Sequence, residues 1–448
     1  MNPIHIQTTI PGPKSTQMIQ RANNAIASTQ YIGCFGITLS SGKGNYITDV
    51  DGNTYLDFLS GASVVTLGYG REDLIQTYAD AARKLQHSCY PYSPNEESIH
   101  FAESLIKVTP GAFDKRVLFG LSGSDSIDAA IKIARKYTGR KNIISFNNGY
   151  HGSTGLSLAA NGFEVFHAGL FLDDGFDKVD FPATNEEAER TLSAIENLLK
   201  KGNVAALITE TVQGDGGNIV PPQGFHKSLA DLLHQYQAVY VVDEVQSGSG
   251  RSGKWWECEH FDIIPDILCT AKGITSGYAP LSACVARREM AETLTKAQHL
   301  FTFSGHLPSC AVAEKVFSIL SEEKLLENAA IRGKQLKQGL EKLVGVYPCA
   351  KEVRGLGLHM GFEVIDTRDQ TPLGGLFAFR CVEKGLYPGY FGPTNNVMRL
   401  HPPLTINQEE VQYAVDVISA VVEEWETRRF PQETIQRYRQ FSVGLGTD

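Results

Sequence analysis

Short runs of branched apolar residues alternate with amphipathic segments over most of the chain. An apolar run without polar alternation is typical of a parallel strand that is covered on both faces. Such strands are expected at 116–119, 142–146, 204–209, 238–243, 266–271 and 281–285. Apolar residues at helical spacing predict helices near 15–29, 72–86, 309–320, 325–343 and 408–428. Strands that alternate with helices predict an α/β protein with a mostly parallel sheet.

The pattern changes near residue 315, where charged amphipathic helices and short strands replace the buried runs. A chain of 448 residues is also too long for one small core and suits a large domain with a smaller one. We therefore expect a large domain at 60–314 and a smaller α+β domain at 315–448, which the amino-terminal segment 1–59 joins. Within that segment, Asp51-Gly52 lies between two alternating runs and predicts a β-hairpin.

Composition narrows the class of protein. The hydrophobic content of 42% and the charged content of 20% are ordinary for a soluble globular enzyme. A net charge of −9 without a basic stripe argues against a nucleic-acid partner. No apolar run approaches the ~20 residues that cross a bilayer, and no signal-peptide pattern opens the chain, so we expect no membrane partner. The eight cysteines form no metal-binding spacing, so we expect no bound metal and a cytoplasmic location.

Two of the predicted strands end in residues that could perform chemistry. One stops on Asp243, and the other leads to Lys272, 272 − 243 = 29 positions later. Ligands of an open α/β sheet bind beyond the carboxyl ends of its strands, so both side chains should enter one crevice. A lysine amine can hold an aldehyde as a Schiff base, and an aspartate can keep a pyridine nitrogen protonated. Together they predict a site for pyridoxal 5'-phosphate (PLP), although singly Asp243 could cap a helix and Lys272 could be solvated.

Two further loops could complete such a site. Ser122-Gly123-Ser124 follows a predicted strand and opens a helix. Backbone N–H groups at a helix start suit a phosphate, but either serine could instead be a simple N-cap. Tyr150, at the exit of strand 142–146, could lie on an aromatic cofactor with support from His151, or it could pack on the edge of the sheet.

Charged residues in two other places could act on a substrate. Strand 204–209 leads into Glu210 and then into Asp215, inside a loop whose three glycines allow positive φ and close ligand approach. A charged residue in such a loop is more often functional than decorative. Arg399 lies on a short predicted strand that Pro402-Pro403 ends. Its guanidinium could hold a carboxylate through two hydrogen bonds, although a surface arginine would look the same.

These residues resemble the class III (subgroup II) aminotransferase family of PLP fold type I, and the resemblance covers nearly the whole chain. The matching motifs are Asp49-Val50-Asp51-Gly52, Ser122-Gly123-Ser124, Tyr150-His151-Gly152, Glu210 with Gln213-Gly214, Asp243-Glu244-Val245-Gln246, Ala271-Lys272-Gly273, Thr302-Phe303, and Arg399-Leu400 with Pro402-Pro403-Leu404. The resemblance implies a seven-stranded, mostly parallel sheet in the large domain and a smaller α+β domain. It also implies PLP as the cofactor and an amino acid as the substrate.

The resemblance assigns four residues to the cofactor ring. Lys272 holds PLP covalently, and Asp243 pairs with the pyridinium nitrogen. Tyr150 stacks on the ring, and Gln246 contacts the side of the phenolic oxygen.

The resemblance assigns another four residues to the phosphate and the substrate. Gly123 and Ser124 hold the phosphate, which Thr302 reaches from the partner subunit. Arg399 binds the substrate carboxylate. The implied assembly is a homodimer with shared active sites, and a tetramer is the alternative.

The chain departs from the family pattern at two positions. Family transaminases commonly carry Gly-Glu-Gly-Gly where this chain has Gly214-Asp215-Gly216-Gly217, and Gly-Asn-Pro where it has Gly305-His306-Leu307-Pro308. The second departure leaves the shape of the interface loop open. The first resembles the family branch of amino-acid racemases and epimerases, which includes isoleucine 2-epimerase and aminocaprolactam racemase.

A racemase must deliver a proton to Cα from the face opposite its lysine, so it needs a second acid/base. Asp215 is the candidate, provided that desolvation raises its pKa toward neutrality. We therefore expect an amino-acid racemase or epimerase that uses Lys272 and Asp215 on opposite faces. The alternative is an aminotransferase, in which Asp215 only pairs with Arg399 in the empty enzyme. A PLP-dependent decarboxylase and a non-enzymatic PLP-binding regulator are the remaining hypotheses, and the lack of a DNA-reading module disfavours the regulator.

Overall fold

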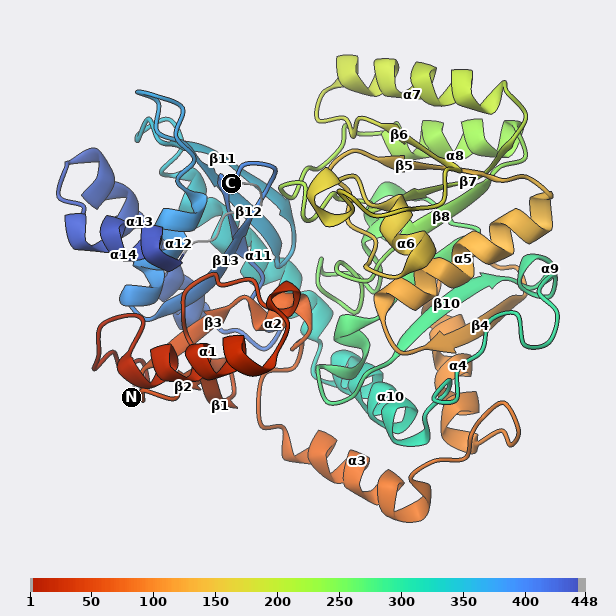
Figure 1. Ribbon diagram of the computed structural model, residues 1–448, viewed down its shortest axis with the longest axis horizontal. Coiled ribbons are helices and arrows are strands. Elements are labelled where there is room, and N and C mark those ends of the chain that lie inside the picture. The colour runs from red at the N-terminus through yellow and green to blue at the C-terminus, as the bar shows by residue number, and fades with distance from the viewer. Residues whose placement is uncertain (1–2, 442–448) are drawn as a thin grey trace. The chain divides into compact units, whose positions relative to one another are not determined.

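The computed structural model describes residues 3–441, which contacts within the chain divide into two compact units (Figure 1). One unit comprises residues 72–327. The other comprises the residues up to Arg71 together with those from Asn328 onward. The domain boundaries expected from the sequence, 59/60 and 314/315, stay a prediction.

The 72–327 unit is built on a seven-stranded sheet in the order β4-β10-β9-β8-β7-β5-β6. The strands are β4 (Lys115–Gly120), β5 (Asn142–Phe146), β6 (Phe176–Val179), β7 (Val204–Thr209), β8 (Val239–Asp243), β9 (Ile267–Thr270) and β10 (Ser282–Arg287). Strands β5 to β9 pair in parallel, and β10 runs antiparallel to both of its neighbours. The expected α/β fold with a mostly parallel seven-stranded sheet is therefore confirmed.

Every residue of β7 and β8 is buried, as the continuous apolar runs predicted. Strands β5 and β7 have the predicted bounds, whereas β10 extends two residues beyond its predicted end at Val285. Those two residues, Ala286 and Arg287, pair with β4, so the partner strand rather than local apolarity sets the end of β10.

Helices cover both faces of this sheet. Val239 and Val241 of β8 belong to the apolar cluster that includes residues of α5. Tyr240 lies between them in the strand, and its hydroxyl is hydrogen-bonded to His226 Nδ1 of α8 at 3.0 Å. Because successive strand residues point to opposite faces, α5 and α8 lie on opposite faces. The helices of the unit are α3 (Glu72–Leu85), α4 (Glu96–Val108), α5 (Gly123–Thr138), α6 (Gly155–Ala160), α7 (Asn185–Leu199), α8 (Phe225–Gln235), α9 (Arg288–Ala291) and α10 (Leu307–Glu322).

The second unit has its own seven-stranded sheet, in the order β1-β2-β3-β13-β14-β12-β11. Its strands are β1 (Leu39–Lys43), β2 (Tyr46–Asp49), β3 (Thr54–Phe58), β11 (Ala350–Leu356), β12 (His359–Val364), β13 (Leu386–Phe391) and β14 (Val397–Leu400). Strands β2 and β3 form the predicted hairpin around Asp51-Gly52, and only the β3–β13 pair is parallel among the described strands of this sheet. This is an α+β unit.

The helices of this unit are α1 (Pro13–Ala25), α2 (Ser60–Ser63), α11 (Leu325–Glu341), which begins at the boundary, α12 (Gly374–Glu383), α13 (Gln408–Glu426) and α14 (Gln432–Phe441). The helix predicted at 15–29 is wrong at its end: α1 stops at Ala25, and a separate 3-10 turn follows at Ser28–Gln30. A residue outside α1 caps its first turn: the Asp51 carboxylate accepts hydrogen bonds from the backbone N–H groups of Lys14 and Ser15. Across residues 3–441, no helix combines the length and the apolar character needed to cross a bilayer.

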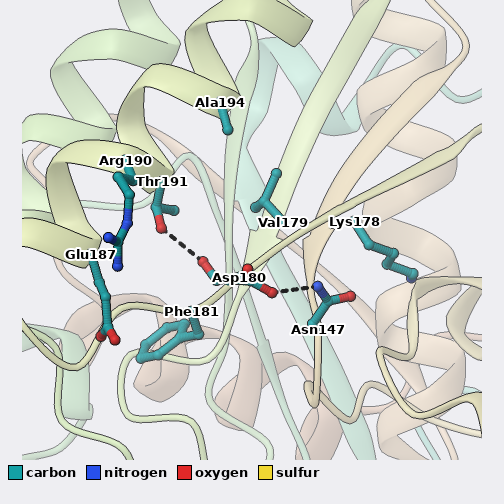
Figure 2. A pocket seen from close by; sticks show the side chains of 9 residues that line it. All are labelled: Asn147, Lys178, Val179, Asp180, Phe181, Glu187, Arg190, Thr191 and Ala194. Atoms are coloured by element: carbon teal, nitrogen blue, oxygen red, sulfur yellow. Dashed lines mark hydrogen bonds between the residues drawn. The ribbon is translucent and has the colours of Figure 1, made fainter.

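A pocket of about 490 Å³ lies beside the edge strand β6, between Asn147 and one face of α7 (Figure 2). Two of its polar side chains bind Asp180, which also lines it. The Asn147 amide donates to the Asp180 carboxylate at 2.6 Å, and the Thr191 hydroxyl donates to the Asp180 carbonyl at 3.0 Å. None of the site residues predicted from the sequence lines this pocket, so we look for the active site elsewhere in the unit.

Candidate active site

The two residues that first indicated a cofactor follow neighbouring strands. Strands β8 and β9 are parallel, and Asp243 pairs in register with Cys269. Lys272 comes three residues after Cys269, so both side chains leave the sheet at its carboxyl edge. Lys272 has a φ of 47°, a left-handed conformation that is uncommon for residues other than glycine and often marks functional sites.

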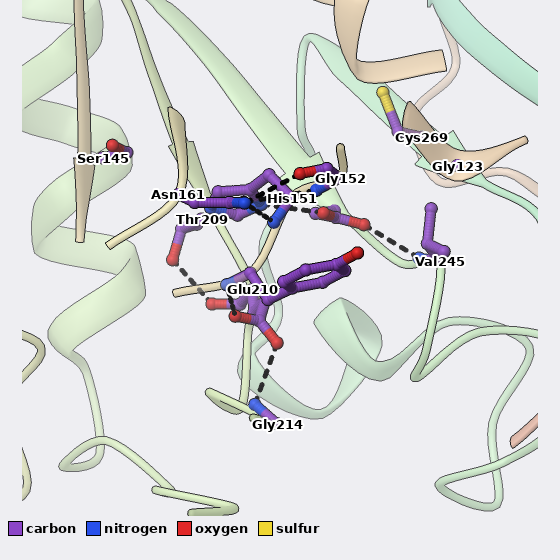
Figure 3. Close-up of polar contacts among 12 residues, drawn as sticks. Gly123, Ser145, His151, Gly152, Asn161, Thr209, Glu210, Gly214, Val245 and Cys269 are labelled. Carbon is purple, nitrogen blue, oxygen red and sulfur yellow. Dashed lines mark hydrogen bonds and ion pairs between the residues drawn. The ribbon is translucent and has the colours of Figure 1, made fainter. Parts of the chain in front are cut away.

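The Asp243 carboxylate is fixed by two donors on different segments. His151 Nδ1 lies 2.8 Å from Oδ2, and the backbone N–H of Val245 donates to Oδ1 at 3.0 Å. Both His151 and Asp243 are buried, and Asn161 in turn accepts a hydrogen bond from the His151 backbone N–H at 2.6 Å (Figure 3). The His151 imidazole, which could support Tyr150, is hydrogen-bonded to Asp243, and the expected role of Tyr150 stays a prediction. A carboxylate oxygen only accepts hydrogen bonds, so in this contact the imidazole donates from Nδ1.

Replacing His151 with phenylalanine removes one of the two donors to a buried carboxylate. We expect the free energy of unfolding to fall by about 1–3 kcal/mol and PLP binding to weaken, because Asp243 loses its orientation. Calorimetry and equilibrium dialysis of PLP measure the two effects.

His226 provides the matched control. It is also buried, its Nε2 lies 2.8 Å from the Thr211 carbonyl, and burial lowers its pKa to about 4. His226→Phe should therefore lower stability and leave the PLP affinity unchanged. An unchanged PLP affinity in His151→Phe would contradict the proposal that His151 orients Asp243 for cofactor binding.

The start of α5 has the features of a phosphate site. Ser122 is the N-cap, and its side chain accepts from the backbone N–H of Asp125, so the N-cap interpretation holds for that serine. Ser124 lies in the first helical turn, and its Oγ accepts a hydrogen bond from the backbone N–H of Ser153 at 3.0 Å. A Cβ at Gly123 would lie 2.7 Å from Val245 Cγ1, so only glycine allows the helix start to approach the loop after β8 this closely.

Tyr150 is half-buried in the loop after β5, next to His151. Its hydroxyl lies 3.1 Å from Ser153 Oγ, and its ring makes an edge contact with Phe166 at 5.4 Å between centroids. The backbone N–H of Tyr150 donates to Glu210 at 3.2 Å. These contacts hold the ring beside the segments that carry Asp243 and Ser124, where a planar cofactor could stack on it.

Asp215 lies on a loop that is tightly closed. The backbones of Gln213 and Ile219 pair with each other, and the N–H groups of Gly217 and Asn218 both donate to the Gly214 carbonyl. These hydrogen bonds therefore hold the glycine-rich loop in a closed turn. Gln246 Nε2 lies 3.5 Å from Asp215 Oδ1, which places the loop acid beside the segment that follows Asp243.

The glycines of this loop serve two different purposes. Gly217 has a φ of 118°, which few other residues adopt. A Cβ at Gly214 would overlap the Gln246 amide, and one at Gly216 would overlap the Gln213 amide. The loop thus needs glycine for its backbone conformation at Gly217, whereas a side chain at Gly214 or Gly216 would have to displace the flexible amide end of a glutamine.

Two glutamates near the site are buried. Burial, and then the charges of Asp215 and Asp243, raise the pKa of Glu210 well above its usual range. Burial, and then the charge of Glu257, raise the pKa of Glu244 to about 7. Glu244 accepts hydrogen bonds from Ser247 and from the backbone N–H groups of Glu257 and Cys258, so it fastens the loop after β8 to the segment near residue 257.

Thr302 is exposed on a turn before α10, within the 72–327 unit. The same turn is anchored at Gly305, whose carbonyl accepts from the Asn95 amide at 3.1 Å. Arg399 belongs to the other unit, on β14, where its guanidinium lies 4.3 Å from the centre of the Phe391 ring. The expected roles of both residues stay predictions.

Comparison with known proteins places this geometry in a family. A model described as aminotransferase class-III matches residues 28–422. The chain belongs to the class III aminotransferase family. Its expected resemblance to this family is confirmed.

The relatives of this class III chain differ in activity. It is 32% identical over 452 residues to an alanine/serine racemase from Pyrococcus horikoshii, which covers 95% of this chain and 94% of the relative. It is 32% identical to an isoleucine 2-epimerase from Lentilactobacillus buchneri, which covers 90% of this chain and 94% of the relative. It is also 33% identical to a 4-aminobutyrate aminotransferase from Mycobacterium tuberculosis, which covers 93% of this chain and 97% of the relative. Identity alone does not separate the two activities.

Solved structures support the fold and the cofactor. An amine transaminase from an uncultivated Pseudomonas species, in its PLP-bound form, superposes with a TM-score of 0.80 at 31% identity and covers 87% of this chain and 95% of that one. The class III chain supplies a matching donor set: an amine at Lys272, a carboxylate fixed by two donors at Asp243, and a helix start opened by Gly123. These residues fit PLP, and PLP is the cofactor of this enzyme.

Proposed function

We propose that this class III enzyme is an amino-acid racemase or epimerase. The observation that carries the proposal is the placement of Asp215, an acid on a closed loop beside Gln246 and thus at the same sheet edge as Asp243 and Lys272. A racemase needs an acid/base in addition to its lysine, and a transaminase does not.

The proposed roles follow from the contacts of each residue. Bound PLP withdraws electrons from the substrate and makes its Cα proton acidic. The Asp243 carboxylate is oriented by its hydrogen bonds with His151 and Val245, so it can face the pyridine nitrogen and pair with it. Lys272 holds the cofactor through its amine, and it takes or gives the Cα proton on one face.

Asp215 gives or takes the proton on the opposite face. For the remaining residues, we propose that Gly123 and Ser124 bind the phosphate and that Tyr150 lies on the ring. Gln246 then contacts both the phenolic side of the cofactor and Asp215.

Two proposed roles depend on other parts of the assembly. Arg399 binds the substrate carboxylate, for which a guanidinium held over an aromatic ring is well suited, because its N–H donors stay in the plane of the group. Thr302 reaches the phosphate of a second copy, in a homodimer with shared sites. Its exposure on an anchored turn is consistent with that role.

One assay separates the proposal from its alternative. A single enantiomer of each of a panel of amino acids is incubated with the PLP-loaded enzyme in D₂O, with and without 2-oxoglutarate. We expect the opposite enantiomer, with deuterium at Cα, to form without any oxo acid. Chiral chromatography and mass spectrometry measure both changes. Product that forms only with 2-oxoglutarate, as a new oxo acid, would establish the aminotransferase instead.

A further inference from the structure

The loop that follows β5 is closed on itself. Residues 149–162 leave the end of the strand and return beside it, where the backbone N–H of Gly162 donates to the Gly149 carbonyl at 2.8 Å. A Cβ at Gly162 would lie 2.2 Å from the Phe146 carbonyl oxygen, so only glycine allows the two ends of the loop to meet. The chain leaves through an outgoing limb, Tyr150-His151-Gly152, and returns through α6.

The side chain of Asn161 joins the end of α6 to the outgoing limb. Asn161 is fully buried, and it makes three hydrogen bonds within the loop (Figure 3). Its Oδ1 accepts from the backbone N–H groups of His151 at 2.6 Å and Gly152 at 3.2 Å, and its Nδ2 donates to the Gly152 carbonyl at 2.7 Å. An amide can do this because it combines an acceptor with a donor. One side chain thus holds three consecutive peptide groups.

The first of these peptide groups fixes the backbone of His151. From that backbone the imidazole reaches Asp243, with 2.8 Å between Nδ1 and Oδ2, and both side chains are buried. Asp243 is the residue proposed to pair with the pyridine nitrogen. The position of the His151 backbone, and therefore Asn161, determines how the imidazole meets the carboxylate at the ring end of the site.

The other two peptide groups lie against the start of α5. A Cβ at Gly152 would lie 2.8 Å from the Cα of Ser124, so the outgoing limb and the helix start are in close contact. The next backbone N–H, that of Ser153, donates to Ser124 Oγ at 3.0 Å. Ser124 is proposed to bind the phosphate. By holding Gly152, Asn161 therefore also determines how the loop meets the phosphate end of the site.

The returning part of the loop is bonded to the same helix. Asp128 of α5 accepts from the Thr154 hydroxyl at 2.8 Å and from the backbone N–H of Ser157 at 2.7 Å. Thr154 is the N-cap of α6, and Ser157 lies in its first turn. These bonds fasten α6, and with it Asn161, to the helix that carries Ser124. The amide thus holds the outgoing limb in register with α5.

We propose that Asn161 is a positioning residue for both ends of PLP. It sets the ring end through His151 and Asp243, and it sets the phosphate end through Gly152 and Ser124. It acts on the cofactor only through the backbone of the loop. The inference rests on the proposed cofactor contacts of Asp243 and Ser124, and it applies to a racemase and to a transaminase alike.

The test compares two nuclei of bound PLP, the phosphate phosphorus and a ring nitrogen labelled with ¹⁵N. His151→Phe should move mainly the nitrogen resonance, and Ser124→Ala should move mainly the phosphorus resonance, because each variant changes one end of the site. Asn161→Ala removes all three hydrogen bonds of the loop and should move both resonances. Equilibrium dialysis should show that its PLP affinity is about tenfold lower, which is the worth of one hydrogen bond.

Asn53 provides the matched control in the other unit. It is also fully buried, and its Oδ1 also accepts from two consecutive backbone N–H groups, those of Gln7 at 2.8 Å and Thr8 at 3.0 Å. Asn53→Ala should lower the melting temperature, as Asn161→Ala does, because each leaves buried backbone groups without a side-chain partner. It should leave both resonances and the PLP affinity at their wild-type values.

Asn161→Asp keeps the acceptor and loses only the donation to Gly152, so its PLP affinity should lie between those of the wild type and Asn161→Ala. Its two resonances decide the question if the alanine variant does not fold. A folded Asn161 variant that moves only one resonance, or neither, would overturn the inference while the contacts of Asp243 and Ser124 stand. If His151→Phe and Ser124→Ala moved neither resonance, those proposed contacts would fail, and the inference with them.

Discussion

Lys272→Ala should abolish covalent PLP binding and lower turnover by about 10⁴-fold or more, because the variant loses both the attachment amine and the proton-transfer group on one face of Cα. The strained backbone should persist, since alanine meets the same steric restrictions at a φ of 47° as lysine does. Borohydride reduction followed by peptide mass spectrometry measures the attachment, and isotope exchange at Cα measures the proton transfer.

Lys227 offers a control of the same residue type in the same unit. It lies on α8, exposed and paired with Asp231 at 3.0 Å. Lys227→Ala should keep the reduced PLP adduct at residue 272 and wild-type turnover. If Lys272→Ala still acquired a stoichiometric adduct at another lysine, or kept its rate of Cα exchange, the assignment of the active-site amine would fail.

The part of the fold that sequence predicts well is the part that local burial determines. β5 and β7 have the predicted bounds, because a strand that is covered by helices on both faces carries a mostly apolar run. Asp243 and Lys272 could be paired from sequence alone, since parallel strands end at one edge of their sheet. The hairpin around Asp51-Gly52 follows from turn chemistry in the same way.

The features that sequence did not predict depend on contacts between distant segments. His151 and Asp243 are 92 positions apart, and no spacing rule connects an imidazole in one loop with a carboxylate at the end of another strand. Asn161, which fixes the His151 backbone, carries no motif signal. The closed shape of the Asp215 loop was missed for a related reason, because three glycines predict freedom, whereas the hydrogen bonds to the Gly214 carbonyl remove it.

In the proposed function the acid of that loop distinguishes a racemase from a transaminase, and Asp215→Asn should separate the two activities. The amide is close in size to the carboxylate and can still meet the Gln246 amide, so the loop should keep its shape. It cannot exchange protons, so inversion should fall by about 10²–10⁴-fold. Deuterium exchange with retention should continue through Lys272. Chiral chromatography and mass spectrometry on one sample measure both rates.

Two companion variants sharpen this result. Asp231→Asn changes an exposed aspartate on α8 and should leave inversion and exchange at wild-type rates. Asp215→Glu keeps a carboxyl but places it one methylene further from the backbone. Because hydrogen bonds to the Gly214 carbonyl hold the loop closed, the loop cannot shift to compensate, and the carboxyl is displaced. Its inversion rate should lie between those of the wild type and Asp215→Asn, because proton transfer needs hydrogen-bond distance. Wild-type inversion in Asp215→Asn would instead require a different donor for the second face of Cα.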